Sequence, residues 1–294
     1  MRAWRLARRG DLEALEAFLR SQEARAAGLV ARLLRDGSLA LPGPLRGGLW
    51  LREGEGGGIR SVLLGLPGGL WMPQFSEGPK ELEGLAPALS ADARRAFAQG
   101  WTVPASIIGP ASSVAAFEAA LGLEPDWRVD YLLMVRPPWS SGPPAGSGPG
   151  LRRAAPPDLD LLVPLQKAYE EEEVITPIHV FDEEGSRAFL AKSLREQLVV
   201  VAEEDREGGN SVLGKAGTNA RAFSLDQIGG VYVLPERRGK GLGKVLMEYL
   251  LSLTAKEGRG ASLFVKKSNA AALALYAGLG FEGLDDFRAD YIRP

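Results

Sequence analysis

In the C-terminal half of the chain, apolar and polar positions follow helical and strand periodicities in turn. Apolar residues recur at helical spacing over residues 158–172 and again over residues 185–196, so both stretches predict helices. The apolar run at residues 198–202 is short enough for a strand, and further strands are expected around Val212 and over residues 228–234. The pattern therefore begins with two helices and continues into a sheet.

The rest of this half repeats the alternation of helix and strand. An amphipathic helix is predicted over residues 243–256, a strand over residues 262–265, a short helix over residues 270–277 and a closing strand near Asp290. This order predicts an α/β protein of the α+β kind, in which helices flank both faces of a mixed, mostly antiparallel sheet.

A segment rich in proline and glycine divides the chain near its middle. Nine of the fourteen residues 137–150 are proline or glycine, a composition that sustains neither a helix nor a central strand. We interpret this segment as a linker. The sequence thus predicts a first domain over residues 1–136 and a second over residues 151–294.

The two halves resemble each other in sequence. The Leu-Gly-x-Glu sequence at residues 121–124 recurs at residues 279–282, and an aromatic-Arg-x-Asp-Tyr sequence follows each copy, at residues 127–131 and 287–291. A duplicated α/β unit is the simplest account of this repeat.

Composition and charge narrow the classes of function. The 35 basic side chains nearly balance the 37 acidic ones, so the chain lacks the basic excess of proteins that bind nucleic acids or membranes. It has no cysteine, which excludes thiol nucleophiles and thiolate metal sites, and we interpret its single histidine, His179, as a packed or rim residue. We expect no bound metal. No apolar run reaches the ~18 residues of a membrane span, and a cytoplasmic protein is expected.

The strongest chemical signal is a loop between the strand ending at Leu234 and the helix starting at Gly243. Residues 235–243 carry glycine at three alternate positions, which allows a ligand to approach the backbone closely, and several basic residues lie among and beside them. The loop also opens a helix, whose unpaired amides and dipole favour an anion. It matches neither the Walker loop nor the dinucleotide fingerprint. We interpret it as a pyrophosphate site.

In this region the sequence resembles the GNAT superfamily of acetyl-CoA-dependent acyltransferases. Arg238, Gly241 and Gly243 match the family's Arg/Gln-x-x-Gly-x-Gly/Ala loop. Downstream, Asn269 and Tyr276 stand where the family has an asparagine after the next strand and a tyrosine in the following helix, and a Gly-Phe pair comes next. The resemblance covers about residues 199–291.

The resemblance implies acetyl-CoA as the cosubstrate and a tandem of two GNAT-like units. In the second unit, the parallel strands 228–234 and 262–265 are expected to splay, so that the pantetheine arm pairs with their free backbone groups. A bulge at Gly229-Gly230 would aim the following amides at the thioester carbonyl. The expected acetyl-CoA-binding residues are Val231, Tyr232, Val233, Arg238, Gly239, Lys240, Gly241, Leu242, Gly243, Lys244, Asn269 and Tyr276.

The transfer also needs an acid and a base. Tyr276 is the candidate donor of a proton to the departing thiolate, although the same residue also suits a packed aromatic position. An amine acceptor must lose a proton, and the acidic run at residues 170–173 offers Glu172 and Glu173 as acceptor-pocket residues. The alternative for this run is a solvated helix end. Asp226 and Gln227 are further candidates for the base.

The first half has no Arg-x-x-Gly-x-Gly sequence, and aligning the repeats puts Ala111 opposite Asn269 and Glu118 opposite Tyr276. It is therefore expected to be a degenerate unit that completes the acceptor cleft or anchors a homodimer. The sequence predicts an N-acetyltransferase that transfers acetyl directly to a small-molecule amine or peptide in a ternary complex. Two alternatives stay open: an aminoacyl-transferase that uses aminoacyl-tRNA, and a non-catalytic CoA-binding sensor.

Overall fold

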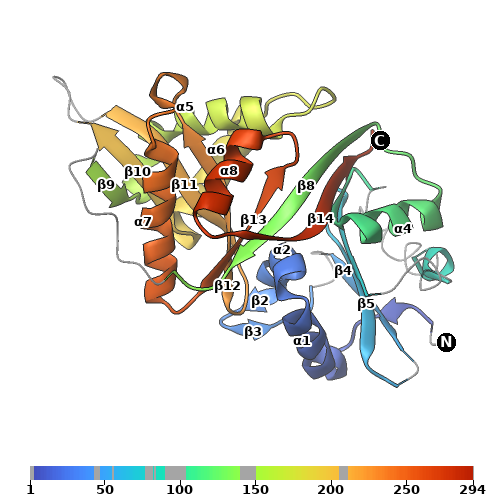
Figure 1. The fold of residues 1–294 in the computed structure, drawn as a ribbon. Coiled ribbons are helices and arrows are strands. Elements are labelled where there is room, and N and C mark those ends of the chain that lie inside the picture. The colour runs from blue at the N-terminus through green and yellow to red at the C-terminus, as the bar shows by residue number, and fades with distance from the viewer. Residues whose placement is uncertain are drawn as a thin grey trace. The chain divides into compact units, whose positions relative to one another are not determined.

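The chain folds into two compact units, each described here by itself (Figure 1). Unit 1 comprises Met1–Leu133 and Leu284–Pro294, and unit 2 comprises Met134–Gly283. The computed structural model describes residues 3–42, 47–54, 56–76, 82, 84–89, 104–139, 150–204 and 211–293. Residues 140–149 of the expected linker lie outside the described residues.

Unit 1 is a mostly antiparallel sheet with helices packed against it. Its strands run in the order β1-β4-β5-β6-β7-β14-β8, and the pair β6–β7 is parallel. The strands are β1 (Arg5–Leu6), β4 (Gly48–Glu53), β5 (Ile59–Gly65), β6 (Leu70–Phe75), β7 (Ser106–Pro110), β8 (Trp127–Arg136) and β14 (Glu282–Tyr291), with a separate hairpin of β2 (Leu34–Arg35) and β3 (Ser38–Leu39). The helices are α1 (Leu12–Ser21), α2 (Glu23–Leu33) and α4 (Ala111–Leu121).

The end of the chain belongs to unit 1 and not to the second half, where the sequence division had placed it. Strand β14 pairs antiparallel with β7, with Phe287 opposite Pro110 and Tyr291 opposite Ser106. The buried Phe287 adds its side chain to the core. The pairing of β14 with β7 joins segments that are far apart in the sequence, and local hydrophobic periodicity does not reveal such pairs. The linker was therefore the available sign of a domain boundary, and it predicted a single division of the chain.

In its described residues, unit 2 forms a sheet of five strands, and its elements over residues 159–278 follow the predicted order, whereas the strand at residues 150–153 was not predicted. Its strands run β13-β12-β11-β10-β9, antiparallel except for β12–β13. The strands are β9 (Gly150–Arg153), β10 (Val199–Glu204), β11 (Ser211–Arg221), β12 (Leu225–Val233) and β13 (Gly260–Lys266). The helices are α5 (Leu159–Tyr169), α6 (Glu183–Glu196), α7 (Leu242–Lys256) and α8 (Ala270–Gly278), and a π-helical turn, η5 (Glu170–Val174), follows α5.

Helices cover both faces of the unit 2 sheet, as the alternation of its strands requires (Figure 1). Val199 and Val201 of β10 pack in one cluster with Leu162 of α5 and Leu190 of α6. Val200 lies between them in sequence, so its buried side chain points to the opposite face, against which α7 packs. The mixed, mostly antiparallel fold with flanking helices is confirmed. No helix in the described residues is long and apolar enough to cross a membrane.

The two units share an ion-pair motif that supports the predicted duplication. In each, an arginine binds an aspartate six residues later and a glutamate on an adjacent strand: Arg5 with Asp11 and Glu53, and Arg152 with Asp158 and Glu203. Both aspartates also accept the amide three residues before them, at the start of a 3-10 turn. The arginine and the aspartate of each motif are close in sequence, but the glutamate lies about fifty residues further along the chain, so the complete motif appears only in the structure.

A buried acidic pair lies beside one arginine in unit 1. Glu118 on α4 is 6% exposed and Asp290 on β14 is fully buried. Arg128 Nη2 lies 3.1 Å from Glu118 Oε2 and 2.8 Å from Asp290 Oδ2. Burial and then the neighbouring Asp290 carboxyl raise the pKa of Glu118 to about 8. Glu118 is therefore protonated in the folded protein at neutral pH.

This protonation predicts a dependence of stability on pH. The folded-state pKa of Glu118 lies above the ordinary 4.5, so its contribution to stability is complete below pH 4.5 and is lost as the pH rises through about 8. Glu118→Gln keeps the shape of the protonated carboxyl and does not titrate. We expect the free energy of unfolding in urea to fall more steeply between pH 5 and 8.5 in the wild type than in Glu118→Gln. Parallel curves would contradict a buried, protonated Glu118.

Candidate active site

The predicted phosphate loop connects β12 to α7 and contains two glycines with left-handed backbones. After a 3-10 turn at Pro235–Arg237, the chain passes through Gly239 at φ +72° and Gly241 at φ +77°. A side chain at either position would strain the backbone. A Cβ atom placed there would meet nothing within 4 Å. The space above the loop is therefore open, and the helix α7 begins directly behind it at Leu242.

The backbone amides of this loop are available to a ligand. In the described part of the chain, none of the amides of residues 239–244 donates a hydrogen bond, and the first bonded amide of α7 is that of Val245, which donates to the Gly241 carbonyl. Free amides at a helix N-terminus, together with the helix dipole, bind anions. The geometry suits a phosphate or diphosphate group.

The strand that leads into the loop is bulged and partly unpaired, as predicted. Lys215 of β11 pairs with Tyr232, and two positions further on Gly217 pairs with Gly229, so Gly230 and Val231 together lie opposite one residue of β11. Gly230 adopts φ +62° at this bulge. The parallel pairing of β12 with β13 ends at the pair Ile228–Leu263. Residues 229–233 of β12 therefore have no partner on β13, and the expected splay is confirmed.

The direction of the unpaired amides follows from the alternation of the strand. The amide of Leu234 donates to Leu213 on β11, at 3.0 Å. Amides alternate in direction along a strand, so that of Tyr232 also faces β11, while those of Val231 and Val233 face the side where β13 diverges. These two amides are the ones that an extended amide-containing ligand or a carbonyl oxygen can reach.

The side chain of Arg238 holds the loop and is not free for phosphate. Its two terminal nitrogens each lie 2.7 Å from a carboxylate oxygen of Glu172 on the π-helical turn, and its Nε donates to the Val233 carbonyl at 3.0 Å. Its guanidinium also lies 5.3 Å from the centre of the Tyr232 ring. Arg238 lowers the pKa of Glu172. Glu172 is therefore a paired anion, which makes it a poor acceptor of a proton.

Glu173 is also bound, at the start of α8. Its two carboxylate oxygens lie 3.2 Å from Lys266 Nζ and 3.3 Å from Asn269 Nδ2. Asn269 is the N-cap of α8, and its Oδ1 accepts the amide of Ala272 at 3.0 Å. Glu173 thus connects the π-helical turn to the N-terminus of α8, through the residue that caps this helix.

Tyr276 has a buried ring and an available hydroxyl. The side chain is 8% exposed, and its ring meets that of Phe281 edge to face at 6.0 Å. Burial, with Tyr169 and Glu173 nearby, raises the pKa of Tyr276, so its hydroxyl is protonated at neutral pH. No described residue forms a hydrogen bond with this hydroxyl. Within the described residues, this hydroxyl is therefore available to donate a hydrogen bond or a proton to a ligand.

A cavity of about 520 Å³ lies on the other side of the bulge, among β11, β12, the π-helical turn and α6. Gly229 and Gly230 form part of its floor, and apolar side chains such as Phe181 and Phe189 form part of its wall. Of the acidic run, Glu170 lines this cavity, whereas Glu172 and Glu173 do not. The run therefore reaches the pocket through a residue other than the two that sequence reasoning selected.

The cavity also contains a buried lysine that sequence reasoning missed. Lys215 is 4% exposed, and its Nζ donates to the Gly230 carbonyl at 3.2 Å and lies 4.8 Å from the centre of the Tyr169 ring. Burial lowers its pKa to about 8, although Glu170 opposes the shift. The available signal was a lone lysine in the middle of an apolar strand, between Leu213 and Ala216.

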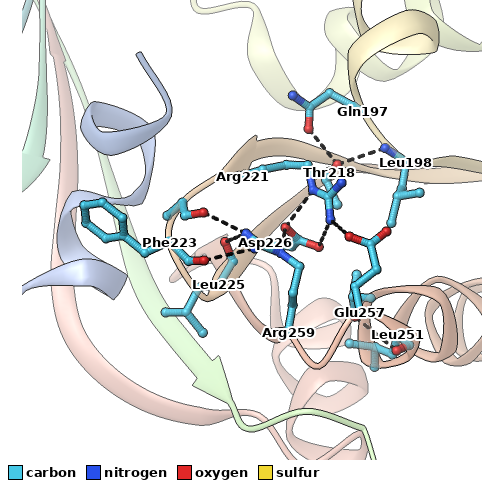
Figure 2. A network of polar contacts seen from close by, with 12 residues as sticks. Gln197, Leu198, Thr218, Arg221, Phe223, Leu225, Asp226, Leu251, Glu257 and Arg259 are labelled. Atoms are coloured by element: carbon cyan, nitrogen blue, oxygen red, sulfur yellow. Dashed lines mark hydrogen bonds and ion pairs between the residues drawn. The ribbon is translucent and has the colours of Figure 1, made fainter. Parts of the chain in front are cut away.

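Asp226 and Gln227 do not reach the cavity. Figure 2 shows Asp226 between two arginines at the turn joining β11 and β12: its Oδ1 lies 3.0 Å from Arg221 Nε and 2.7 Å from Arg259 Nε. Arg259 also donates to backbone carbonyls of this turn. The fully buried Asp226 thus closes the hairpin. Gln227 pairs in register with Ser262 of β13.

Residues 164–281 match the acetyltransferase (GNAT) family. A mycothiol acetyltransferase from Nocardioides sp. is 38% identical over 102 residues, which cover 30% of this chain and 34% of that relative. The match thus spans about a third of the length of the relative.

Three solved structures share the fold over almost the entire chain. A Drosophila protein covers 99% of this chain and 98% of its own, at 14% identity and a TM-score of 0.66. A GCN5-related N-acetyltransferase from Sphaerobacter thermophilus covers 99% and 96%, at 18% identity and a TM-score of 0.58. A tandem GNAT protein from the clavulanic acid biosynthesis pathway covers 99% and 98%, at 18% identity and a TM-score of 0.54. At these identities the likeness concerns the fold.

Proposed function

We infer the function of this chain from the match of residues 164–281 to the GNAT acetyltransferase family, and we propose that it is an acetyl-CoA-dependent N-acetyltransferase. The observation that carries the proposal is the set of free amides at residues 239–244, next to a strand whose edge is unpaired beyond Ile228. Diphosphate and pantetheine present the anion and the amide groups that these two features can bind.

We assign the diphosphate to the loop backbone, in particular to the amides between Gly239 and Lys244. The open space beside the two left-handed glycines supports this assignment, because no atom of the described residues lies within 4 Å of a Cβ atom built at either position. The Arg238 side chain is bound to Glu172 and holds the loop in place. Lys240 and Lys244 add positive charge at its mouth, and Asn269 caps the helix that carries the proposed acid.

The proposed transfer is a direct attack of an amine on the thioester carbonyl. The amides of Val231 and Val233 are placed to stabilise the oxyanion that forms, an effect worth about 3 kcal/mol for one well-aligned donor. Tyr276 donates its hydroxyl proton to the departing thiolate. Glu172 and Glu173 serve this reaction by positioning the loop and α8 through Arg238 and Asn269.

We propose that unit 1 is a degenerate copy without a cofactor site of its own. Residues 76–105, which connect β6 to β7 where the loop would be expected, contain no Arg-x-x-Gly-x-Gly sequence. In the alignment of the two repeats Glu118 takes the place of the tyrosine, and its carboxyl oxygen lies 3.1 Å from Arg128 Nη2. A homodimer anchored by this unit is part of the same proposal.

A thiol-release assay over several classes of acceptor tests the function. Small primary amines, amino acids, aminoglycosides and peptides with free N-termini are each incubated with acetyl-CoA, and aminoacyl-tRNA is added as a competitor. We expect release of free CoA with at least one amine class and no effect of the tRNA. Binding of acetyl-CoA without turnover across the panel would favour a CoA-binding sensor, and inhibition by aminoacyl-tRNA would favour the aminoacyl-transferase.

A further inference from the structure

We take the cavity of about 520 Å³ as the binding site of the acceptor amine, and Lys215 is the charged residue of this acceptor cavity that contacts the bulge. The cavity has three charged lining residues in the described part of the chain, namely Glu170, Asp182 and Lys215. Lys215 Nζ donates to the carbonyl of Gly230, and the next residue, Val231, carries an amide assigned to the thioester carbonyl. The proposed transfer would therefore form its new bond next to the lysine amine.

The surroundings of this amine are unusual for a lysine. The side chain is 4% exposed, and no described carboxylate lies within ion-pair distance of its Nζ. Buried ammonium groups normally have such a partner. The groups around it are the Gly230 carbonyl from β12, the face of the Tyr169 ring from α5 and, further away, the Glu170 carboxylate on the π-helical turn. Asp182 at the start of α6 lines the same cavity.

The carboxylates of this region have other partners. Glu172 binds Arg238, and Glu173 binds Lys266 and Asn269. Glu170 Oε1 accepts hydrogen bonds from Gln166 and Ser186, at 2.6 and 2.9 Å. Asp182 caps α6 by accepting the amide of Gly185 at 3.0 Å.

We propose that Lys215 accepts the proton of the attacking amine, a role that rests on the proposed acetyltransferase function. A second role for a buried lysine would be to anchor a carboxylate of the acceptor. The surroundings disfavour this anchoring role. The Gly230 carbonyl oxygen and the face of the Tyr169 ring carry partial negative charge, and Glu170 carries a carboxylate, so all three repel an incoming anion. An apolar amine that displaces water from the cavity disfavours the ammonium form further.

The proton balance of the transfer closes with two protein groups. The neutral amine attacks the thioester carbon, a C–N bond forms and the carbonyl π pair moves to oxygen. The nitrogen of this intermediate then gives one proton to neutral Lys215 Nζ. As the carbonyl reforms, the C–S bond breaks, and the thiolate sulfur takes the hydroxyl proton of Tyr276. Solvent afterwards removes a proton from Lys215 and returns one to Tyr276. A base whose pKa lies near the working pH is the most effective in such a step.

The first test is a pH–rate profile with acetyl-CoA and 2-phenylethylamine, an apolar primary amine suited to the cavity wall. Lys215→Arg keeps the positive charge and the donors but cannot accept a proton. We expect kcat/KM of the wild type to rise with an inflection near pH 8, and that of Lys215→Arg to be about 100- to 10,000-fold lower without this inflection. Lys192→Arg, on the exposed side of α6, is the matched control and keeps the wild-type profile. A Lys215→Arg enzyme within about threefold of the wild type, with the inflection kept, would overturn the proposal.

A second measurement needs no acceptor and separates this proposal from the proposed function. Wild-type protein is labelled with trace acetic anhydride between pH 6 and 11, and the labelling of Lys215 and Lys192 is compared by mass spectrometry. We expect Lys215 to show an inflection near pH 8, and the exposed Lys192 serves as the internal reference for the extent of labelling. If the wild type acetylates no amine, the proposed function fails. The labelling experiment still shows whether the Lys215 amine loses its proton near pH 8. An ordinary inflection at Lys215 would overturn the proposal.

Discussion

Gly241→Asp is expected to weaken acetyl-CoA binding by about 100-fold or more, because a carboxylate beside a bound diphosphate costs several kcal/mol. The position lies at the N-cap of α7, where aspartate is a preferred residue, and a Cβ atom built there meets no atom of the described residues within 4 Å. The new carboxylate therefore competes with the phosphates for the free amides, while the left-handed backbone at φ +77° adds a strain that a control variant has to share. Isothermal titration calorimetry with acetyl-CoA measures the effect.

Gly258→Asp is the matched control for this substitution. Gly258 has φ +68° and equally open surroundings, but it follows the C-terminal end of α7, at the other end of the helix from the loop. Both variants carry the same backbone strain and the same added charge. We expect Gly258→Asp to bind acetyl-CoA within about threefold of the wild type. Normal affinity of the Gly241→Asp protein would refute the assignment of the diphosphate to this loop.

Tyr276→Phe is expected to lower kcat by about 100-fold or more while the Kd of acetyl-CoA changes less than about threefold, because the hydroxyl acts on the leaving group and not on binding. The ring packs against Phe281, and this contact survives the substitution. The hydroxyl has no hydrogen-bond partner among the described residues, so the free energy of unfolding should change by less than about 1 kcal/mol. Steady-state kinetics, calorimetry and urea unfolding measure the three quantities.

Tyr249→Phe provides the comparison for this variant. Tyr249 is a partly buried tyrosine on α7 that is not among the cavity-lining residues. Its loss of a hydroxyl should leave kcat unchanged. An unchanged kcat in Tyr276→Phe as well would remove the acid role and leave Tyr276 as a packed aromatic residue.

The local features of the fold were predictable from the sequence, because they depend on near neighbours in the chain. The glycine spacing of the loop indicated its shape, and the structure gives Gly239 and Gly241 the left-handed backbones that only this residue adopts easily. Gly229-Gly230 predicted the bulge in β12 for the same reason. The return of β14 to unit 1 was not predictable in this way, since it depends on pairing with a strand more than a hundred residues away.

The residues around the acceptor cavity were harder to predict, because a run of acidic residues in a sequence does not indicate which of its side chains points into a cavity. In the structure the π-helical turn directs Glu172 to Arg238, while Glu170 lines the cavity. Lys215 was missed because a single lysine on a strand reads as a surface position. Only the packing of Tyr169 and the bulge at Gly230 bury its amine. The partners of these charged side chains are determined by tertiary contacts and not by the spacing of residues in the sequence.

The most direct test of the account is a crystal structure of the protein with acetyl-CoA. We expect the diphosphate oxygens within hydrogen-bond distance of the amides between Gly239 and Lys244, and the thioester carbonyl oxygen at the amide of Val231 or Val233. A coenzyme bound at any other surface, or with its phosphates away from these amides, would contradict the central assignment.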